Sequence, residues 1–164
     1  MVDAPDKLTK EWVRKAEILS EALPFMRRYT NEYVVIKYGG NAMVDPKAAK
    51  SFARDIVLLH QVGLHPIVVH GGGPQIAEML EKLNIKTKFI NGLRVTNEEA
   101  IDIIEMVLSG SINKRIVEAI NAAGGFAVGI SGKDGNLIQA ERLKLEISNQ
   151  ESSHDLGLVG NPKK

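Results

Sequence analysis

Two short apolar runs, each ending in glycines, constrain the fold of this chain more than any other feature. They occupy residues 34–40, with the sequence VVIKYGG, and residues 66–73, with the sequence PIVVHGGG. Both runs are rich in β-branched residues, as buried parallel strands usually are. A helical pattern follows each glycine cluster, and strands that alternate with helices predict a parallel sheet covered on both faces.

The glycines and one lysine fall at the carboxyl ends of these strands, where parallel sheets bind their ligands. Glycine turns and helix N-termini expose backbone N–H groups that suit an anion, and Lys37 adds a positive charge there. A phosphate, a carboxylate or both are the predicted ligands. Two alternatives stay open: a tight turn at Gly71–Gly73 that binds nothing, and a Lys37 side chain that only reaches for solvent.

Further helices are expected on both sides of these strands. One covers residues 9–29, where Pro24 should kink or break it, and others run from Pro46 to about His60 and from Pro74 to Asn84. A capping box of Thr96 and Glu99 predicts another helix, which Gly110 separates from the next one; that helix ends at Gly124-Gly125.

The remaining segments predict strands and one polar tail. Asn91-Gly92 predicts the turn of a β-hairpin, and residues 126–130 predict a further buried strand. Residues 137–140 and 143–147 predict a closing hairpin, whereas residues 148–164 show no clear helix or strand.

Composition limits the classes of function. The 164 residues suit one domain, and the net charge of +1 favours neither nucleic acid nor an anionic membrane. The absence of cysteine excludes disulfides and thiolate metal sites. The charged N-terminus argues against a secretory signal, and no apolar run approaches the roughly 20 residues of a membrane span.

Arg94 follows the predicted turn and has a side chain that can bind a carboxylate through two hydrogen bonds. A lone surface arginine is the alternative interpretation of the same residue. His70 is interpreted as a packing residue beside the glycine loop rather than as a catalyst.

Three segments together resemble the acetylglutamate kinases of the amino acid kinase family. They are residues 36–43 (IKYGGNAM), 69–75 (VHGGGPQ) and 91–96 (NGLRVT), and the similarity runs from about residue 21 to residue 160. The resemblance implies a three-layer αβα sandwich around a largely parallel sheet. It also implies cytoplasmic transfer of the γ-phosphoryl group of ATP to the side-chain carboxylate of N-acetyl-L-glutamate, a step of arginine biosynthesis.

The resemblance also implies roles for the residues on the phosphate side of the site. Lys37 would be the catalytic residue that stabilises charge on the transferred phosphoryl group, and Gly39 and Gly40 would bind phosphates. ATP would enter with Mg²⁺ as a co-substrate, and no metal ligand is expected in this chain. Because the attacking group is already a carboxylate, the reaction requires positioning and charge stabilisation but no general base.

On the acceptor side, the resemblance implies that Gly72 and Gly73 bind N-acetyl-L-glutamate and that Arg94 binds its α-carboxylate. Two alternatives remain: an amino acid kinase with another acceptor, and a non-catalytic module for amino-acid binding or oligomerisation.

The length departs from the family pattern, because members are nearly twice as long. We therefore expect residues 31–164 to form the acetylglutamate-binding N-terminal domain, without the C-terminal half that normally holds the adenine pocket. Little or no kinase activity is expected from this chain alone.

Residues 1–30 resemble the helical extension of arginine-inhibited members, in which that helix is exchanged between dimers to form a hexamer. The resemblance implies a homo-oligomer, either a dimer or a hexamer, with arginine as an effector. A helix folded back on its own domain is the alternative.

Overall fold

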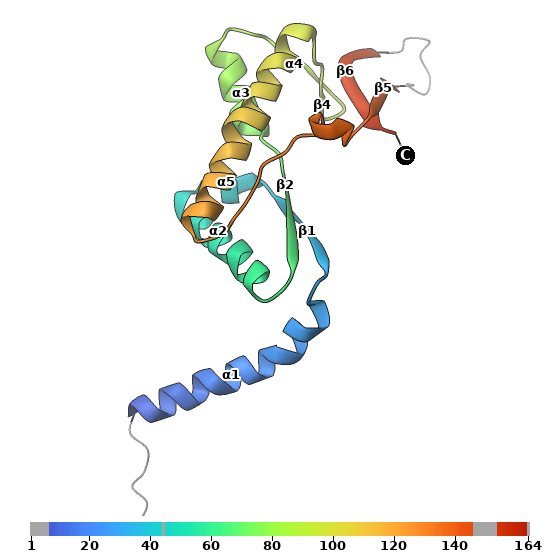
Figure 1. The fold of residues 1–164 in the computed structure, drawn as a ribbon. Helices are drawn as coiled ribbons and strands as arrows, with labels where there is room; N and C mark the ends of the chain where they lie inside the picture. Colours follow the sequence, from blue (N-terminus) through green and yellow to red (C-terminus); the bar gives the residue numbers. More distant parts are fainter. Residues whose placement is uncertain (1–6, 44, 146–153, 164) are drawn as a thin grey trace, which may run out of the picture.

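The computed structural model describes residues 7–43, 45–145 and 154–163. The first element, α1 (Lys7–Tyr29), projects away from the rest of the molecule (Figure 1). It confirms the helix predicted over 9–29, and of the kink or break predicted at Pro24 the break does not occur, because the helix is continuous there. A proline removes one backbone hydrogen bond from a helix, and the turns on either side of Pro24 maintain the helical path.

A parallel pair of strands lies at the centre of the fold. β1 (Tyr33–Tyr38) and β2 (His65–His70) pair over six residues, from Tyr33 opposite His65 to Tyr38 opposite His70. This pairing confirms the predicted α/β class with a parallel sheet.

The connection between these strands is α2 (Pro46–Gln61), whose ends follow their local sequence signals. The Asp45 side chain caps the helix by accepting a hydrogen bond from the Lys47 N–H at 2.9 Å. Just beyond the helix, Gly63 has φ +96°, a conformation that glycine adopts without strain.

Helices cover one face of the sheet. Ala53, Ile56 and Val57 of α2 pack with Ile120 of α5 (Asn113–Ala122). Ile36 and Val68, from the sheet, pack against this cluster. Figure 1 shows α2 and α5 on the same side of the two strands. The described residues therefore supply one helical layer of the predicted three-layer sandwich.

A second core cluster forms between α3 (Gly73–Lys82), α4 (Glu98–Glu105) and the π-helical segment η2 (Met106–Ile112). Leu80 is the largest of its fully buried side chains, at 1% exposed. The helix boundary predicted at Gly110 is wrong, because η2 continues from α4 into α5. A π-helical turn keeps the backbone helical while it accommodates one additional residue.

The start of α4 also differs from the prediction. Asn97, rather than Thr96, is the N-cap, and its side chain accepts a hydrogen bond from the Ala100 N–H at 2.9 Å. Thr96 is buried and its hydroxyl donates to the Arg94 carbonyl oxygen at 3.0 Å. That bond commits the Thr96 hydroxyl to the preceding strand and leaves capping to its neighbour.

The hairpin predicted around Asn91-Gly92 is confirmed. β3 (Phe89–Ile90) and β4 (Leu93–Arg94) pair antiparallel. Asn91 and Gly92 have φ values of +49° and +79°, which is the combination that a type I′ turn requires.

The strand predicted over 126–130 is wrong. Phe126 is 99% exposed and Val128 is 88% exposed, and this segment forms no ladder with the described strands. Its Ala127 N–H donates instead to the Asn121 side-chain oxygen of α5 at 2.7 Å. A segment with strand composition forms a β-strand only where a neighbouring strand pairs with it, and residues 126–130 have no such neighbour among the described strands.

The closing hairpin predicted between residues 137–140 and 143–147 is wrong, because residues 140–145 form one continuous strand and residues 137–139 belong to no strand. β5 (Ala140–Leu145) pairs antiparallel with β6 (His154–Pro162), so the expectation of no strand over 148–164 is wrong for the described part of that range. Residues 146 and 147 of the predicted 143–147 strand lie outside the described residues.

β6 packs against β4 and α4, and hydrogen bonds with Thr96 attach it there. The Thr96 N–H donates to the Leu156 carbonyl oxygen at 3.0 Å, and the Leu158 N–H donates to the Thr96 carbonyl oxygen at 2.7 Å. The side chain of Leu156, whose carbonyl oxygen accepts the first of these bonds, is fully buried. Within the described ranges, no helix combines the length and the apolar character needed to cross a bilayer.

Candidate active site

The carboxyl ends of β1 and β2 form one rim of the sheet. Lys37 lies opposite Val69 in the parallel register, and neighbouring strands are about 5 Å apart. Gly39–Gly40 therefore leave the sheet at the same end as Gly71–Gly73. Side chains alternate along the strand, so the exposed Lys37 and the buried Tyr38 point to opposite faces. The structure thus brings the predicted lysine and both glycine clusters to a common edge.

The second glycine cluster forms the start of a helix. Gly72 is the N-cap of α3, which begins at Gly73. A Cβ atom at Gly72 would lie 2.3 Å from Ile112 Cδ1 and 3.0 Å from Leu108 Cδ2, so this turn packs directly on η2. A Cβ at Gly73 would meet nothing within 4 Å. The backbone is consequently packed on one side at Gly72 and approachable at Gly73, where the N-terminus of α3 favours negative charge.

The first glycine cluster is also open. A Cβ at Gly39 or Gly40 would meet nothing within 4 Å, and Gly40 has φ +63°. Gly40 begins the short 3₁₀ helix η1 (Gly40–Met43), which turns the chain away from the sheet rim. His70 Nδ1 lies 3.1 Å from the Gly71 carbonyl oxygen, so this side chain contacts the adjoining loop.

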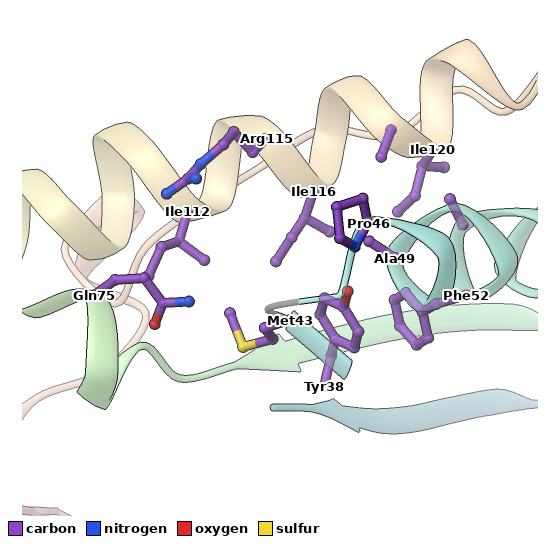
Figure 2. Close-up of a pocket in the computed structure, with 12 residues that line it drawn as sticks. Tyr38, Met43, Pro46, Ala49, Phe52, Gln75, Ile112, Arg115, Ile116 and Ile120 are labelled. Atoms are coloured by element: carbon purple, nitrogen blue, oxygen red, sulfur yellow. The ribbon is translucent and has the colours of Figure 1, made fainter. Parts of the chain in front are cut away.

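A cavity of about 310 Å³ lies beside this rim, and sequence reasoning missed it (Figure 2). The Tyr38 ring stacks on Phe52 with centroids 3.9 Å apart, and burial raises the pKa of the Tyr38 hydroxyl. The Gln75 Oε1 atom is buried without a hydrogen-bond partner among the described residues. Gln75 belongs to the glycine motif, which was the one sequence signal that pointed to this cavity.

Arg94 lies on β4, and its side chain contacts the hairpin. Its Nη1 atom donates a hydrogen bond to Thr87 Oγ1 at 2.6 Å, and the guanidinium lies 4.5 Å from the centre of the Phe89 ring. A guanidinium has five N–H donors, so the bond to Thr87 leaves this side chain capable of further bonds to a carboxylate. These contacts join Arg94 to the hairpin rather than to Lys37 or the glycine clusters.

Among the described residues, metal-ligating side chains do not gather at the rim. In the described part of the chain, no group of three or more His, Cys, Asp or Glu residues is placed to hold a metal ion. The rim offers an ammonium group and backbone N–H groups, which are donors to anions.

The sequence has close relatives among the acetylglutamate kinases. The profile of the amino acid kinase family matches residues 32–160. An acetylglutamate kinase from Rhodospirillum rubrum is 58% identical over 160 residues, which are 95% of this chain and 52% of the relative. An acetylglutamate kinase from Zymomonas mobilis is 55% identical over 163 residues, which are 97% of this chain and 53% of the relative. The chain thus spans about half the length of the curated relatives it matches.

Solved structures share the fold. An N-acetylglutamate synthase from Neisseria gonorrhoeae, complexed with coenzyme A and N-acetyl-glutamate, superposes with a TM-score of 0.67 at 21% identity, over 89% of this chain and 32% of that one. The protein smu.665 from Streptococcus mutans gives a TM-score of 0.64 at 25% identity, over 80% of this chain and 49% of that one. The parallel βα units and the sequence profile over residues 32–160 agree, and this chain belongs to the amino acid kinase family.

Proposed function

We propose that this chain forms the acetylglutamate side of an acetylglutamate kinase site. The reaction would transfer the γ-phosphoryl group of ATP to the side-chain carboxylate of N-acetyl-L-glutamate. The names of relatives that are 55–58% identical support this acceptor. One geometric observation carries the proposal: Lys37 and the Gly71–Gly73 loop share the carboxyl rim of β1 and β2.

Lys37 is proposed as the catalytic residue because its ammonium group brings a positive charge to the end of β1 that forms this rim. During transfer, the bond from the γ-phosphorus to the bridging oxygen of ATP breaks, and a bond forms to a carboxylate oxygen. A cation beside the transferring group stabilises the charge that shifts to its oxygens. Gly39 and Gly40 would present backbone N–H groups to the phosphates, where the lack of side chains leaves room.

The acceptor would lie over Gly72 and Gly73, with Arg94 on its α-carboxylate. The open space at Gly73 and the N-terminus of α3 favour an anion there. Mg²⁺ would arrive bound to the phosphates of ATP, since the described residues offer no carboxylate cluster to hold it.

Calorimetry with N-acetyl-L-glutamate tests the proposal on this chain. Arg94→Ala should weaken binding about 10- to 100-fold, because a hydrogen bond to a charged group contributes about 1.5–3 kcal/mol. Lys88→Ala is the matched control, since it removes an exposed cation from the approach to the same hairpin and should change affinity less than about threefold.

Equal losses of affinity in the two variants would show that Arg94 does not bind N-acetyl-L-glutamate. No binding of N-acetyl-L-glutamate would instead favour a module for assembly. We expect the chain alone to have negligible kinase activity in a coupled assay, and near-normal turnover would contradict that expectation.

Assembly through α1 is part of the same proposal. Trp12 and Leu19 are 63% and 62% exposed, so α1 offers apolar side chains to a partner helix. We propose a homo-oligomer, a dimer or a hexamer, with arginine as an effector and a cytoplasmic location. Sedimentation of the chain with and without arginine tests the assembly and its response.

A further inference from the structure

Thr87 contacts the side chain of Arg94, and the proposed function assigns it no role. Its Oγ1 atom accepts a hydrogen bond from Arg94 Nη1 at 2.6 Å. Thr87 lies two residues before β3, whereas Arg94 lies on β4, so the bond joins the two sides of the hairpin. Both residues are half-buried, and a hydrogen bond from a charged donor is stronger than one between neutral groups. This bond therefore restricts the orientation of the guanidinium.

The Phe89 ring contacts the same guanidinium. Arg94 Cζ lies over this ring, 4.5 Å from its centre, and the two residues are opposite one another in the strand register. A cation is attracted to the face of an aromatic ring, although the attraction is modest where the ring is as exposed as this one. The hydrogen bond and the ring contact together define the plane of the guanidinium more closely than either does alone.

The backbone of Arg94 is held separately from its side chain. Its carbonyl oxygen accepts a hydrogen bond from the buried Thr96 hydroxyl at 3.0 Å, and Thr96 is bonded through its backbone to β6. The guanidinium can therefore change position only by rotation about its own side-chain bonds. A ligand that binds a mobile arginine must first order it, and that ordering reduces the affinity.

The contact with Thr87 leaves Arg94 able to bind an anion. A guanidinium has five N–H donors, and the Thr87 oxygen uses one of them. A carboxylate that accepts two parallel hydrogen bonds requires a guanidinium of defined orientation. We propose that Thr87 is a positioning residue, whose hydroxyl oxygen holds the Arg94 guanidinium in the orientation that binds the α-carboxylate of N-acetyl-L-glutamate. This inference rests on the role proposed for Arg94 above.

Thr87→Val tests the inference because it removes the accepting oxygen and retains a branched side chain of similar size. Thr30→Val is the matched control, since the Thr30 hydroxyl donates to the Met26 carbonyl oxygen at 2.8 Å, outside the hairpin. Calorimetry measures the binding of N-acetyl-L-glutamate to each variant of the 164-residue chain. Thr87→Val should raise Kd about three- to tenfold, the change expected for the loss of one hydrogen bond, and Thr30→Val less than about twofold.

Two comparisons distinguish positioning from a general loss of structure. Thr87→Ser retains the hydroxyl and should bind N-acetyl-L-glutamate within about twofold of the unsubstituted chain. The second comparison uses N-acetyl-γ-aminobutyrate, which has the acetamido group and the distal carboxylate but lacks the α-carboxylate. Its weaker binding can be followed by ligand-observed NMR, and Thr87→Val should leave it unchanged within about twofold. Thr87→Ala, which also lacks the hydroxyl, replaces Thr87→Val if that variant does not fold.

An unchanged Kd of Thr87→Val for N-acetyl-L-glutamate would overturn the inference. A lower Kd would also overturn it, because Thr87 would then hold Arg94 away from the ligand. An equal loss of affinity for both ligands would assign Thr87 to the support of the hairpin instead. If Arg94→Ala weakens binding and Thr87→Val does not, the proposed function stands without this inference. If Arg94→Ala leaves binding unchanged, the role proposed for Arg94 and this inference both fail.

Discussion

Gly157 offers a sharp test of how the C-terminal strand is attached. It has φ +71°, and a Cβ atom there would lie 2.1 Å from the Thr96 carbonyl oxygen. That oxygen accepts the hydrogen bond from the Leu158 N–H, and the buried Leu156 lies on the other side of Gly157. Gly157→Ala should therefore force β6 away from Thr96, because the obstructing atom belongs to the backbone and cannot rotate aside.

The expected loss of stability follows from three contributions. A left-handed alanine costs about 1–2 kcal/mol. The two backbone hydrogen bonds between Thr96 and β6 contribute about 0.5–1.5 kcal/mol each. Partial exposure of Leu156 adds about 1 kcal/mol more. Gly157→Ala should thus lower the free energy of unfolding by about 3–6 kcal/mol, a large share of the roughly 5–15 kcal/mol of a typical domain.

Urea unfolding followed by circular dichroism measures this loss, with Gly135→Ala as the control. Gly135 also has a left-handed backbone, with φ +59°, but a Cβ there would meet nothing within 4 Å. Its replacement should cost only the conformational part, about 1–2 kcal/mol. Losses that agree within about 0.5 kcal/mol would refute the close approach of Gly157 to Thr96, as would an unchanged hydrogen-exchange rate of the Leu158 amide.

Two further substitutions test the second core cluster and a turn. Leu80→Ala should destabilise the chain by about 2–5 kcal/mol because Leu80 is 1% exposed, whereas Leu58→Ala on the surface should stay within about 0.5 kcal/mol; similar losses would contradict this core. The hydrogen bond from the Ser131 N–H lowers the pKa of Asp134 below its ordinary value. The Asp134 carboxylate therefore stabilises the fold at pH values above that ordinary pKa, and this stabilisation is lost as the pH falls through the lowered pKa. Asp134→Asn should lower the melting temperature at pH 7 and reduce its decline between about pH 5 and pH 3; parallel curves would contradict this.

The features that the sequence predicted correctly depend on neighbouring residues. Asp45 and Pro46 start α2, Gly63 follows its end, and Asn91-Gly92 form a tight turn, because each property is a local backbone preference. The common rim of Lys37 and the glycines was also predictable, since parallel strands that precede their helices end at the same edge.

The errors concern features that depend on distant partners. Residues 126–130 have the composition of a strand. Hydrogen bonds with Asn113, Lys114 and Asn121 hold this segment against α5 instead of beside a described strand. β6 needs glycine at position 157 because the backbone there passes closely over Thr96, and that requirement is invisible before the two segments meet. The Arg94 contact with Thr87 and Phe89 depends in the same way on the completed hairpin.

The π-helical turn of η2 sets the rotational phase between α4 and α5. Each helical residue turns the chain by about 100°, so the additional residue in this turn decides which way α5 faces. With it, Ile112 points toward Leu80 while Ile120 points toward Val57 of α2. Deleting Gly110 from this stretch would leave Ile112 and Ile120 in the sequence yet swing Ile120 off α2. The spacing of this stretch, more than its chemistry, joins the two halves of the core.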